Sequence, residues 1–169
     1  MTLAEDQVFI RLVRENDMPL RRIARIYARD ADAQKDLYQD MLVQLWRSFP
    51  SFAGASSAGT WLYRVALNTA LAHVRRRSAR RETPLAEEHD RTDDAGGVEE
   101  RIDAQERVER LYAAIDRLSV TDKMLTMMYL DEKTYREMAD VLGITESNVG
   151  VRLHRIRKEL AAWLSEEPV

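Results

Sequence analysis

The chain has 169 residues, of which 45% are hydrophobic and 33% charged, and its formal net charge is −3. This length fits one domain or two small ones. No stretch approaches the ~18 uncharged apolar residues of a transmembrane helix. The N-terminal sequence MTLAEDQVFI has neither the basic nor the apolar region of a secretory signal. We therefore expect no stable membrane insertion and a cytoplasmic location.

The residue types exclude several kinds of chemistry. Cysteine is absent, which excludes disulfides, thiolate metal sites and a cysteine nucleophile. The histidines are scattered at positions 73, 89 and 154, and the sequence has no nucleotide-binding loop and no Ser–His–Asp grouping. We expect no catalytic residue, no metal, no cofactor and no small-molecule substrate. Glycine and proline number only 6 and 4, which favours an all-α protein.

The charges are unevenly distributed along the chain. Residues 64–81 contain six arginines and no acid, whereas residues 82–109 contain eleven acids and three arginines. Residues 146–160 contain four basic and two acidic side chains. Two basic segments separated by an acidic one indicate a polyanionic partner. The alternative is a set of ordinary solvated helix faces.

The first block of helical pattern covers residues 1–81. Apolar residues over 3–13 predict an opening helix, and those over 20–27 repeat every three or four residues, as a second helix requires. Between them the sequence NDMP at 16–19 predicts a cap or break, because proline suits the first turn of a helix.

The same block contains two further helical stripes. Apolar residues over 37–49 predict a third helix, and the small and turn residues at 50–59 predict a loop. Thr60 is the expected cap of a fourth helix, which carries apolar residues from 61 to 74 and ends in the arginine run.

The second block follows an acidic segment. Residues 82–98 are polar, contain Pro84 and Gly96-Gly97, and predict a flexible linker. Apolar residues over 102–118 and 124–130 then predict two helices. The methionine-rich run of the second resembles an adaptable binding surface, but core packing is its simpler explanation.

The last two helices show the sharpest local pattern. Residues 134–142 predict a short helix that ends at Gly143, where a turn needs positive φ. Ala139 is small enough for two helices to cross closely, and Thr145 is the expected cap of the next helix. That helix has an apolar face at spacings of 4, 3 and 4 residues, made by Val149, Leu153, Ile156 and Leu160. This is the pattern of a helix-turn-helix, whose second helix enters the major groove; an ordinary helical hairpin is the alternative.

Three motifs in order resemble one known family. The segments are DLYQDMLVQLW at 36–46, TWLYRVALN at 60–68, and YREMADVLGI at 135–144 followed by the basic helix to residue 157. Together they resemble the extracytoplasmic-function sigma factors, small bacterial initiation factors of RNA polymerase. The resemblance covers nearly the whole chain. It implies a sigma region two domain over 1–81, an acidic linker over 82–98 and a sigma region four domain over 99–169.

The resemblance implies roles for two helices of the first domain. The helix from Asp36 to Trp46 would bind the clamp of core RNA polymerase through Asp36, Gln39, Asp40, Gln44 and Trp46. The helix after the 48–60 loop would melt and read the −10 element. The candidates there are Asn68, Trp61, Tyr63, Arg64, Arg75, Arg76 and Arg77.

Each kind of −10 candidate suits a different contact. Asn68 would contact a flipped base, since an amide presents both a donor and an acceptor. Trp61 and Tyr63 would stack on unpaired bases, although the core is the more natural place for Trp61. The run from Arg75 to Arg77 would hold the DNA backbone.

The helix-turn-helix would read the −35 element. The sequence departs from the family at Gly150 and Val151, where many relatives carry a basic and a small polar residue. Base reading then falls on neighbouring positions, and a close approach to the DNA backbone would explain Gly150. The candidates are Ser147, Asn148, Arg152, His154, Arg155 and Lys158.

The resemblance also implies partners: core RNA polymerase, promoter DNA and an anti-sigma factor that holds the protein inactive. Two other functions remain open from the residues alone. A helix-turn-helix regulator acting without core polymerase explains the second block but leaves the motifs at 36–46 and 60–68 unexplained. A protein that binds polymerase or another sigma factor without reading DNA would tolerate charge reversal of Arg152 and Arg155.

Overall fold

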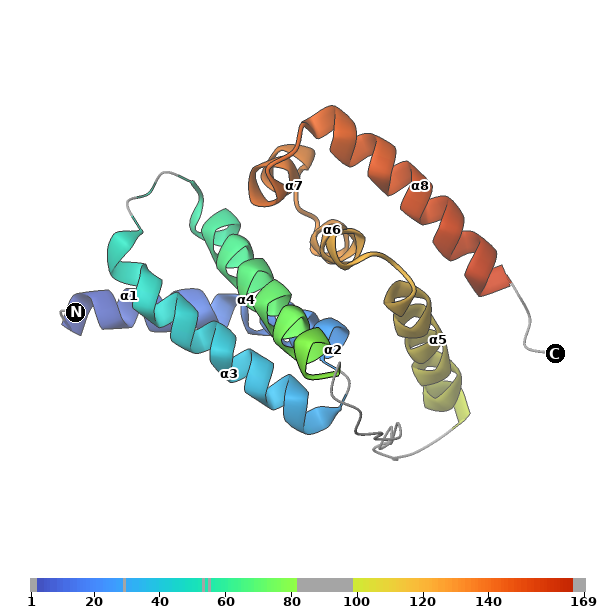
Figure 1. The fold of residues 1–169 in the computed structure, drawn as a ribbon, viewed down its shortest axis with the longest axis horizontal. Coiled ribbons are helices and arrows are strands. Elements are labelled where there is room, and N and C mark those ends of the chain that lie inside the picture. The colour runs from blue at the N-terminus through green and yellow to red at the C-terminus, as the bar shows by residue number, and fades with distance from the viewer. Residues whose placement is uncertain (1–2, 29, 53, 55, 82–98, 166–169) are drawn as a thin grey trace. The chain divides into compact units, whose positions relative to one another are not determined.

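The computed structural model describes residues 3–28, 30–52, 54, 56–81 and 99–165. Every regular element in these ranges is a helix (Figure 1), and the chain forms two compact units. The prediction of an all-α fold with two small helical domains is confirmed. The predicted linker at 82–98 lies outside the described residues.

The N-terminal unit packs three helices around one core. Helices α2, α3 and α4 contact one another, and α1 lies against α2. Phe9 fastens α1 to the end of α3, with its ring centroid 5.0 Å from that of Trp46 and 5.3 Å from that of Phe49. The elements are α1 (Leu3–Glu15), α2 (Asp17–Tyr27), α3 (Ala31–Ser48), the 3-10 turn η1 (Phe49–Ser51) and α4 (Ala58–Arg81). The core includes Leu20, Ile23, Leu37, Met41, Leu45 and Leu62.

The cap or break predicted at 16–19 is present, since α1 ends at Glu15 and α2 begins at Asp17. Asn16 stands at the N-cap position, but its side chain donates to the Leu12 carbonyl in the last turn of α1 and makes no cap hydrogen bond. The start of α4 differs from the prediction. At α4 the cap is Ser57, whose hydroxyl oxygen accepts from the Thr60 backbone N–H at 3.1 Å. Thr60 itself is buried and lies within the helix. The predicted cap was therefore three residues late.

The C-terminal unit contains four helices. Helix α8 contacts α5 and α6, which also contact each other. The methionine-rich run of α6 is buried, so core packing explains it. The elements are α5 (Glu99–Asp116), α6 (Val120–Leu130), α7 (Tyr135–Leu142) and α8 (Glu146–Ser165). The core includes Ile115, Met124, Leu125, Met128, Val149, Leu153 and Ile156.

The turn between α7 and α8 has the predicted geometry. Gly143 adopts φ 67° and ψ 35°, and its N–H donates to the Ala139 carbonyl at 2.8 Å. The Thr145 hydroxyl accepts from the Asn148 backbone N–H at 3.2 Å, so it caps α8 as expected. Because both caps are made within a few residues, the local sequence determines the turn between the two helices.

A reciprocal capping box opens α7. The Thr134 hydroxyl accepts from the Glu137 N–H at 3.2 Å, and the Glu137 carboxylate accepts from the Thr134 N–H at 2.9 Å. That backbone hydrogen bond from Thr134 is the main reason why the pKa of Glu137 lies below its usual value. Two donors at the helix start are thus satisfied by side chains.

Thr134→Ala is expected to lower the free energy of unfolding by about 1 kcal/mol, because it leaves a helix-start donor without its acceptor. Urea unfolding followed by far-UV circular dichroism measures the change. Thr134→Ser keeps the hydroxyl and is expected to match the wild type. Equal stabilities of the Ala and Ser variants would show that the hydroxyl contributes nothing.

Among the described residues, no helix combines the length and the apolar character that crossing a bilayer requires.

Candidate polymerase and nucleic-acid interfaces

The outer face of α3 is an exposed strip with an apolar end. Asp36, Gln39, Val43 and Trp46 follow one another at spacings of three, four and three residues, so they share one face. Val43 and Trp46 are 45% and 44% exposed. Val43 was not among the predicted contacts because those were chosen as the polar residues of this helix together with Trp46. Its place off the buried apolar stripe is the sequence signal that could have identified it.

The groove between α3 and α4 brings together candidates from two predicted functions. It is a shallow, open hollow of about 390 Å³. On the α3 side, Asp40 and Gln44 face α4 instead of sharing the outer strip. On the α4 side, Asn68 is exposed at the groove. The lining residues are Asp40, Gln44, Val65, Asn68, Thr69, Ala72 and Arg76.

An ion pair crosses this groove. Arg76 Nη2 lies 2.9 Å from Asp40 Oδ2, and both side chains remain about half exposed. The pair therefore joins a predicted polymerase contact to a predicted DNA contact. Exposed pairs of this kind contribute only about 0–1 kcal/mol, so either partner can exchange the other for a new ligand at little cost.

One predicted base-stacking residue is corrected by the structure. Tyr63 is completely buried, so its ring has no face on which a base could stack, and it belongs to the core. Trp61 is half-buried. Its ring centroid lies 5.0 Å from that of Phe52 and 6.0 Å from that of Phe49. Trp61 therefore holds the loop before α4 against the helix, which agrees with the core alternative while leaving part of its ring exposed.

The arginine run lies along the second half of α4. Arg75 and Arg76 are exposed, Arg77 is half-buried, and Arg64 is exposed about three turns before them.

His73 lies just before the arginine run. Its pKa is lowered, first by burial and then by the charges of Arg76 and Arg77. The acids of α3 oppose this shift only in part. At neutral pH the uncharged imidazole is therefore the favoured form of His73 in the folded protein.

His73→Gln is expected to make the protein less sensitive to mild acid. In the wild type the pKa of His73 is lower in the folded state than the ~6.5 of an unfolded chain, so the unfolded state binds its proton first. The contribution of neutral His73 to the free energy of unfolding is fully present above the unfolded-state pKa. It is lost as the pH falls from that value towards the lower pKa of the folded state. Urea unfolding at pH 7.5 and pH 5 should show a larger loss for the wild type. A larger loss for the variant would mean that the α3 carboxylates hold His73 charged.

The exposed face of α8 carries four of the six predicted −35 contacts. Ser147, Asn148, His154 and Lys158 are all exposed. Val151, at 68% exposure, lies among them. The opposite face is buried against the rest of the unit, as the apolar spacing predicted.

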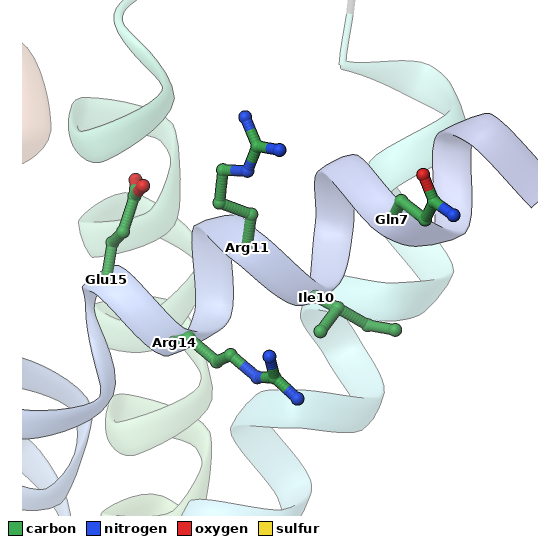
Figure 2. A pocket seen from close by; sticks show the side chains of 5 residues that line it. All are labelled: Gln7, Ile10, Arg11, Arg14 and Glu15. Atoms are coloured by element: carbon green, nitrogen blue, oxygen red, sulfur yellow. The ribbon is translucent and has the colours of Figure 1, made fainter.

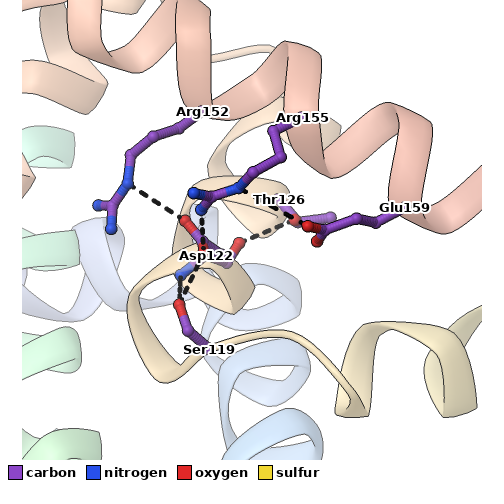
Figure 3. A network of polar contacts seen from close by, with 6 residues as sticks. All are labelled: Ser119, Asp122, Thr126, Arg152, Arg155 and Glu159. Carbon is purple, nitrogen blue, oxygen red and sulfur yellow. Dashed lines mark hydrogen bonds and ion pairs between the residues drawn. The ribbon is translucent and has the colours of Figure 1, made fainter.

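The other two predicted −35 contacts lie at the flank of α8. Arg152 and Arg155 reach towards Asp122 of α6 (Figure 3). A Cβ added at Gly150 would lie 3.5 Å from the Tyr135 ring, an ordinary contact with α7. Packing against α7 therefore does not require glycine at this position.

A second shallow hollow, of about 420 Å³, lies on α1. Its side chains spread outward from the helix and do not converge, as Figure 2 shows. It contains none of the predicted site residues, and its charges are mixed. The lining residues are Gln7, Ile10, Arg11, Arg14 and Glu15. In the part of the chain that the structure describes, no group of three or more acidic or histidine side chains is placed to hold a metal ion.

Comparison with known proteins identifies both units. The Sigma-70 region 2 family model matches residues 12–80, and the Sigma-70, region 4 model matches residues 108–160. The chain is 29% identical over 158 residues to the ECF RNA polymerase sigma factor SigM of Mycobacterium tuberculosis, covering 92% of this chain and 76% of SigM. It is 30% identical over 131 residues to the RNA polymerase sigma factor YlaC of Bacillus subtilis, covering 76% of each protein.

Solved structures share the fold. CnrH, in complex with the cytosolic domain of CnrY, aligns with a TM-score of 0.71 at 21% identity, over 96% of this chain and 91% of CnrH. RpoE of Bartonella quintana, in complex with the anti-sigma factor NepR, aligns with a TM-score of 0.69 at 18% identity, over 96% of this chain and 98% of RpoE. With both family regions present in order and relatives that match along most of their length, the chain belongs to the extracytoplasmic-function sigma factors of the sigma-70 family.

Proposed function

We propose that this sigma factor binds core RNA polymerase through its N-terminal unit and directs it to promoters by reading a −10 element beside α4 and a −35 element with α8. The proposed division is region two over 1–81, a linker over 82–98 and region four over 99–169. The observation that supports it best is the α3–α4 groove, where candidates for polymerase and for DNA lie side by side.

The outer strip of α3 is the proposed polymerase surface. Its exposed apolar end, Val43 and Trp46, provides hydrophobic contact area, and Asp36 and Gln39 provide polar contacts at the other end. Aromatic residues surrounded by polar ones are typical centres of protein interfaces. Phe9 supports the inner edge of the Trp46 ring, so little side-chain freedom is lost on binding.

The groove is the proposed −10 site. Separating stacked bases takes ~1.4 kcal/mol per step, and capture of a flipped base is what would offset this. Asn68 offers a donor and an acceptor at the groove, and the partly exposed Trp61 offers aromatic surface to an unpaired base. Arg64, Arg75, Arg76 and Arg77 would hold phosphates nearby. Sigma factors are non-catalytic, and we extend this to the present chain.

Helix α8 is the proposed −35 reader. Its exposed Ser147, Asn148, His154 and Lys158 suit contacts with base edges and phosphates in a major groove. Arg155 adds a contact from the flank. Val151 offers an apolar surface of the kind that packs against a thymine methyl group.

An anti-sigma factor is the proposed regulator. The two structural neighbours are described as complexes, CnrH with CnrY and RpoE with the anti-sigma factor NepR. We propose a partner of this kind for the present chain. Since polymerase and promoter DNA lie in the bacterial cytoplasm, the proposal places the protein there.

Run-off transcription tests the proposal. Core RNA polymerase is supplied with a pool of genomic promoter fragments, with and without the protein. Specific transcripts that depend on the protein are expected, and their aligned upstream sequences should share two elements. Duplex binding without polymerase and without transcripts would support the regulator alternative. Polymerase binding without transcripts in the absence of any inhibitor would support an interaction protein.

A further inference from the structure

A buried carboxylate lies beneath the flank of α8. Asp122 is in the first turn of α6, and its side chain is only 5% exposed. Its Oδ2 accepts from the Ser119 hydroxyl at 2.7 Å and from Arg155 Nη2 at 2.9 Å. Its Oδ1 lies 3.4 Å from Arg152 Nε without hydrogen-bond geometry. Figure 3 shows both arginines reaching from α8 towards this one carboxylate.

The burial of Asp122 makes these contacts hard to give up. A charge removed from water is stabilised mainly by its partners. If both arginines left for DNA phosphates, the carboxylate would remain buried with a single hydroxyl donor. The two arginines are thus tied to the protein more firmly than an exposed ion pair would tie them.

The basic side chains of α8 differ in how firmly the protein holds them. Arg157 packs over the ring of Tyr129, 4.7 Å from its centroid. Lys158 is exposed on the outer face, and no ion pair with it is found among the described residues. Arg155 keeps 54% of its side chain exposed while it is paired with the buried Asp122 and, at 3.7 Å, with the partly exposed Glu159. It can therefore offer its outer N–H groups only from a fixed position.

We propose that Asp122 is a positioning residue that withholds Arg152 and Arg155 from sequence-independent phosphate contacts and holds Arg155 in one orientation. This inference rests on the proposed role of α8 as a DNA reader. Sequence-independent binding comes from cations free to follow phosphates. An arginine held in one position adds affinity only for DNA that places a hydrogen-bond acceptor next to its guanidinium group. Asp122 thus lowers non-specific affinity and favours selective reading.

The first test measures binding of the full chain to a mixed-sequence 25-base-pair duplex by fluorescence anisotropy, over a series of KCl concentrations. Asp122→Asn should bind several-fold more tightly at low salt. The slope of log K against log salt should steepen by about 0.9 for each additional phosphate that the variant neutralises. Asp116→Asn is the matched control: it removes the same charge and breaks the Asp116–Lys123 pair, and it should not reproduce the effect.

A second comparison is made in the wild-type chain and changes only exposed side chains, so it does not depend on the folding of the Asp122 variant. Lys158→Gln should flatten the wild-type slope by about 0.9, whereas Arg155→Gln should change it much less. A third measurement places Arg155→Gln in the Asp122→Asn background, where it should flatten the slope more than it does in the wild-type chain. Far-UV circular dichroism checks that each variant is helical.

Two outcomes would overturn the inference in distinguishable ways. Equal effects of Arg155→Gln and Lys158→Gln in the wild type would show that Arg155 is not withheld, while α8 would still bind DNA. No effect of Lys158→Gln on binding would remove α8 as the DNA surface, so the proposed −35 role and the inference would fail together.

Discussion

Val43→Asp is expected to weaken binding to core RNA polymerase by about 30-fold or more, while the N-terminal unit stays folded. Val43 lies on the exposed strip of α3 between Gln39 and Trp46, and the residue is 45% exposed. A carboxylate there would be desolvated without a partner when the strip is covered, and leaving a buried charged group without a partner costs about 2 kcal/mol or more. Titration of labelled protein with core polymerase, followed by fluorescence anisotropy, measures the loss.

Val108→Asp is the matched control for this prediction. Val108 is on α5 in the other unit and is 44% exposed, so the chemical change and the starting exposure are nearly the same. Its affinity for core polymerase should equal that of the wild type. If Val43→Asp bound as tightly as Val108→Asp, the outer strip of α3 would not be the polymerase surface.

Gly143→Ala and Gly150→Ala are expected to change stability in opposite directions. Gly143 has φ 67°, and a Cβ there meets nothing within 4 Å. Gly143→Ala is therefore expected to lower the free energy of unfolding by about 1–2 kcal/mol through backbone strain alone. Gly150 has helical backbone, and a Cβ would make an ordinary 3.5 Å contact with the Tyr135 ring. Alanine there should gain about 1 kcal/mol of helix propensity.

Urea unfolding of both variants alongside the wild type gives the comparison, with transcription as a second readout. The two glycine variants should differ by about 2–3 kcal/mol in their free energies of unfolding. A Gly150→Ala variant that is stable but fails at promoters would support the expectation that DNA approaches this position closely. A Gly143→Ala variant as stable as the wild type would show that the turn can relax out of the left-handed region.

Helix positions and turn chemistry were largely predictable, because they depend on neighbours a few residues apart. The spacing of apolar residues along α3 and α8 identified their buried faces, and Gly143 and Thr145 identified the turn between α7 and α8. Ser57 was not identified as the cap of α4 because both it and Thr60 carry suitable hydroxyls. Only the backbone shows which of them lies outside the helix.

Features of the candidate sites that depend on distant residues were not predictable. Asp122 and Arg155 are 33 residues apart, and no local pattern pairs an acid in α6 with an arginine in α8. Tyr63 illustrates the opposite difficulty. Its residue type suits base stacking, but its position in the helix places it in the core. The residue type alone does not show whether an aromatic side chain in a helix is buried or available to a base.

The hydrogen bonds that shape the helix-turn-helix also bear on how its specificity can change. Those of the Thr134 capping box, the Gly143 turn and the Thr145 cap span only three to five residues. Contacts so close in sequence form early and with little loss of chain entropy during folding. The exposed positions of α8, such as Ser147, His154 and Lys158, take no part in them. If α8 reads the −35 element as proposed, a lineage of such proteins can acquire new promoter preferences by substitution on that face without re-evolving the motif that presents it.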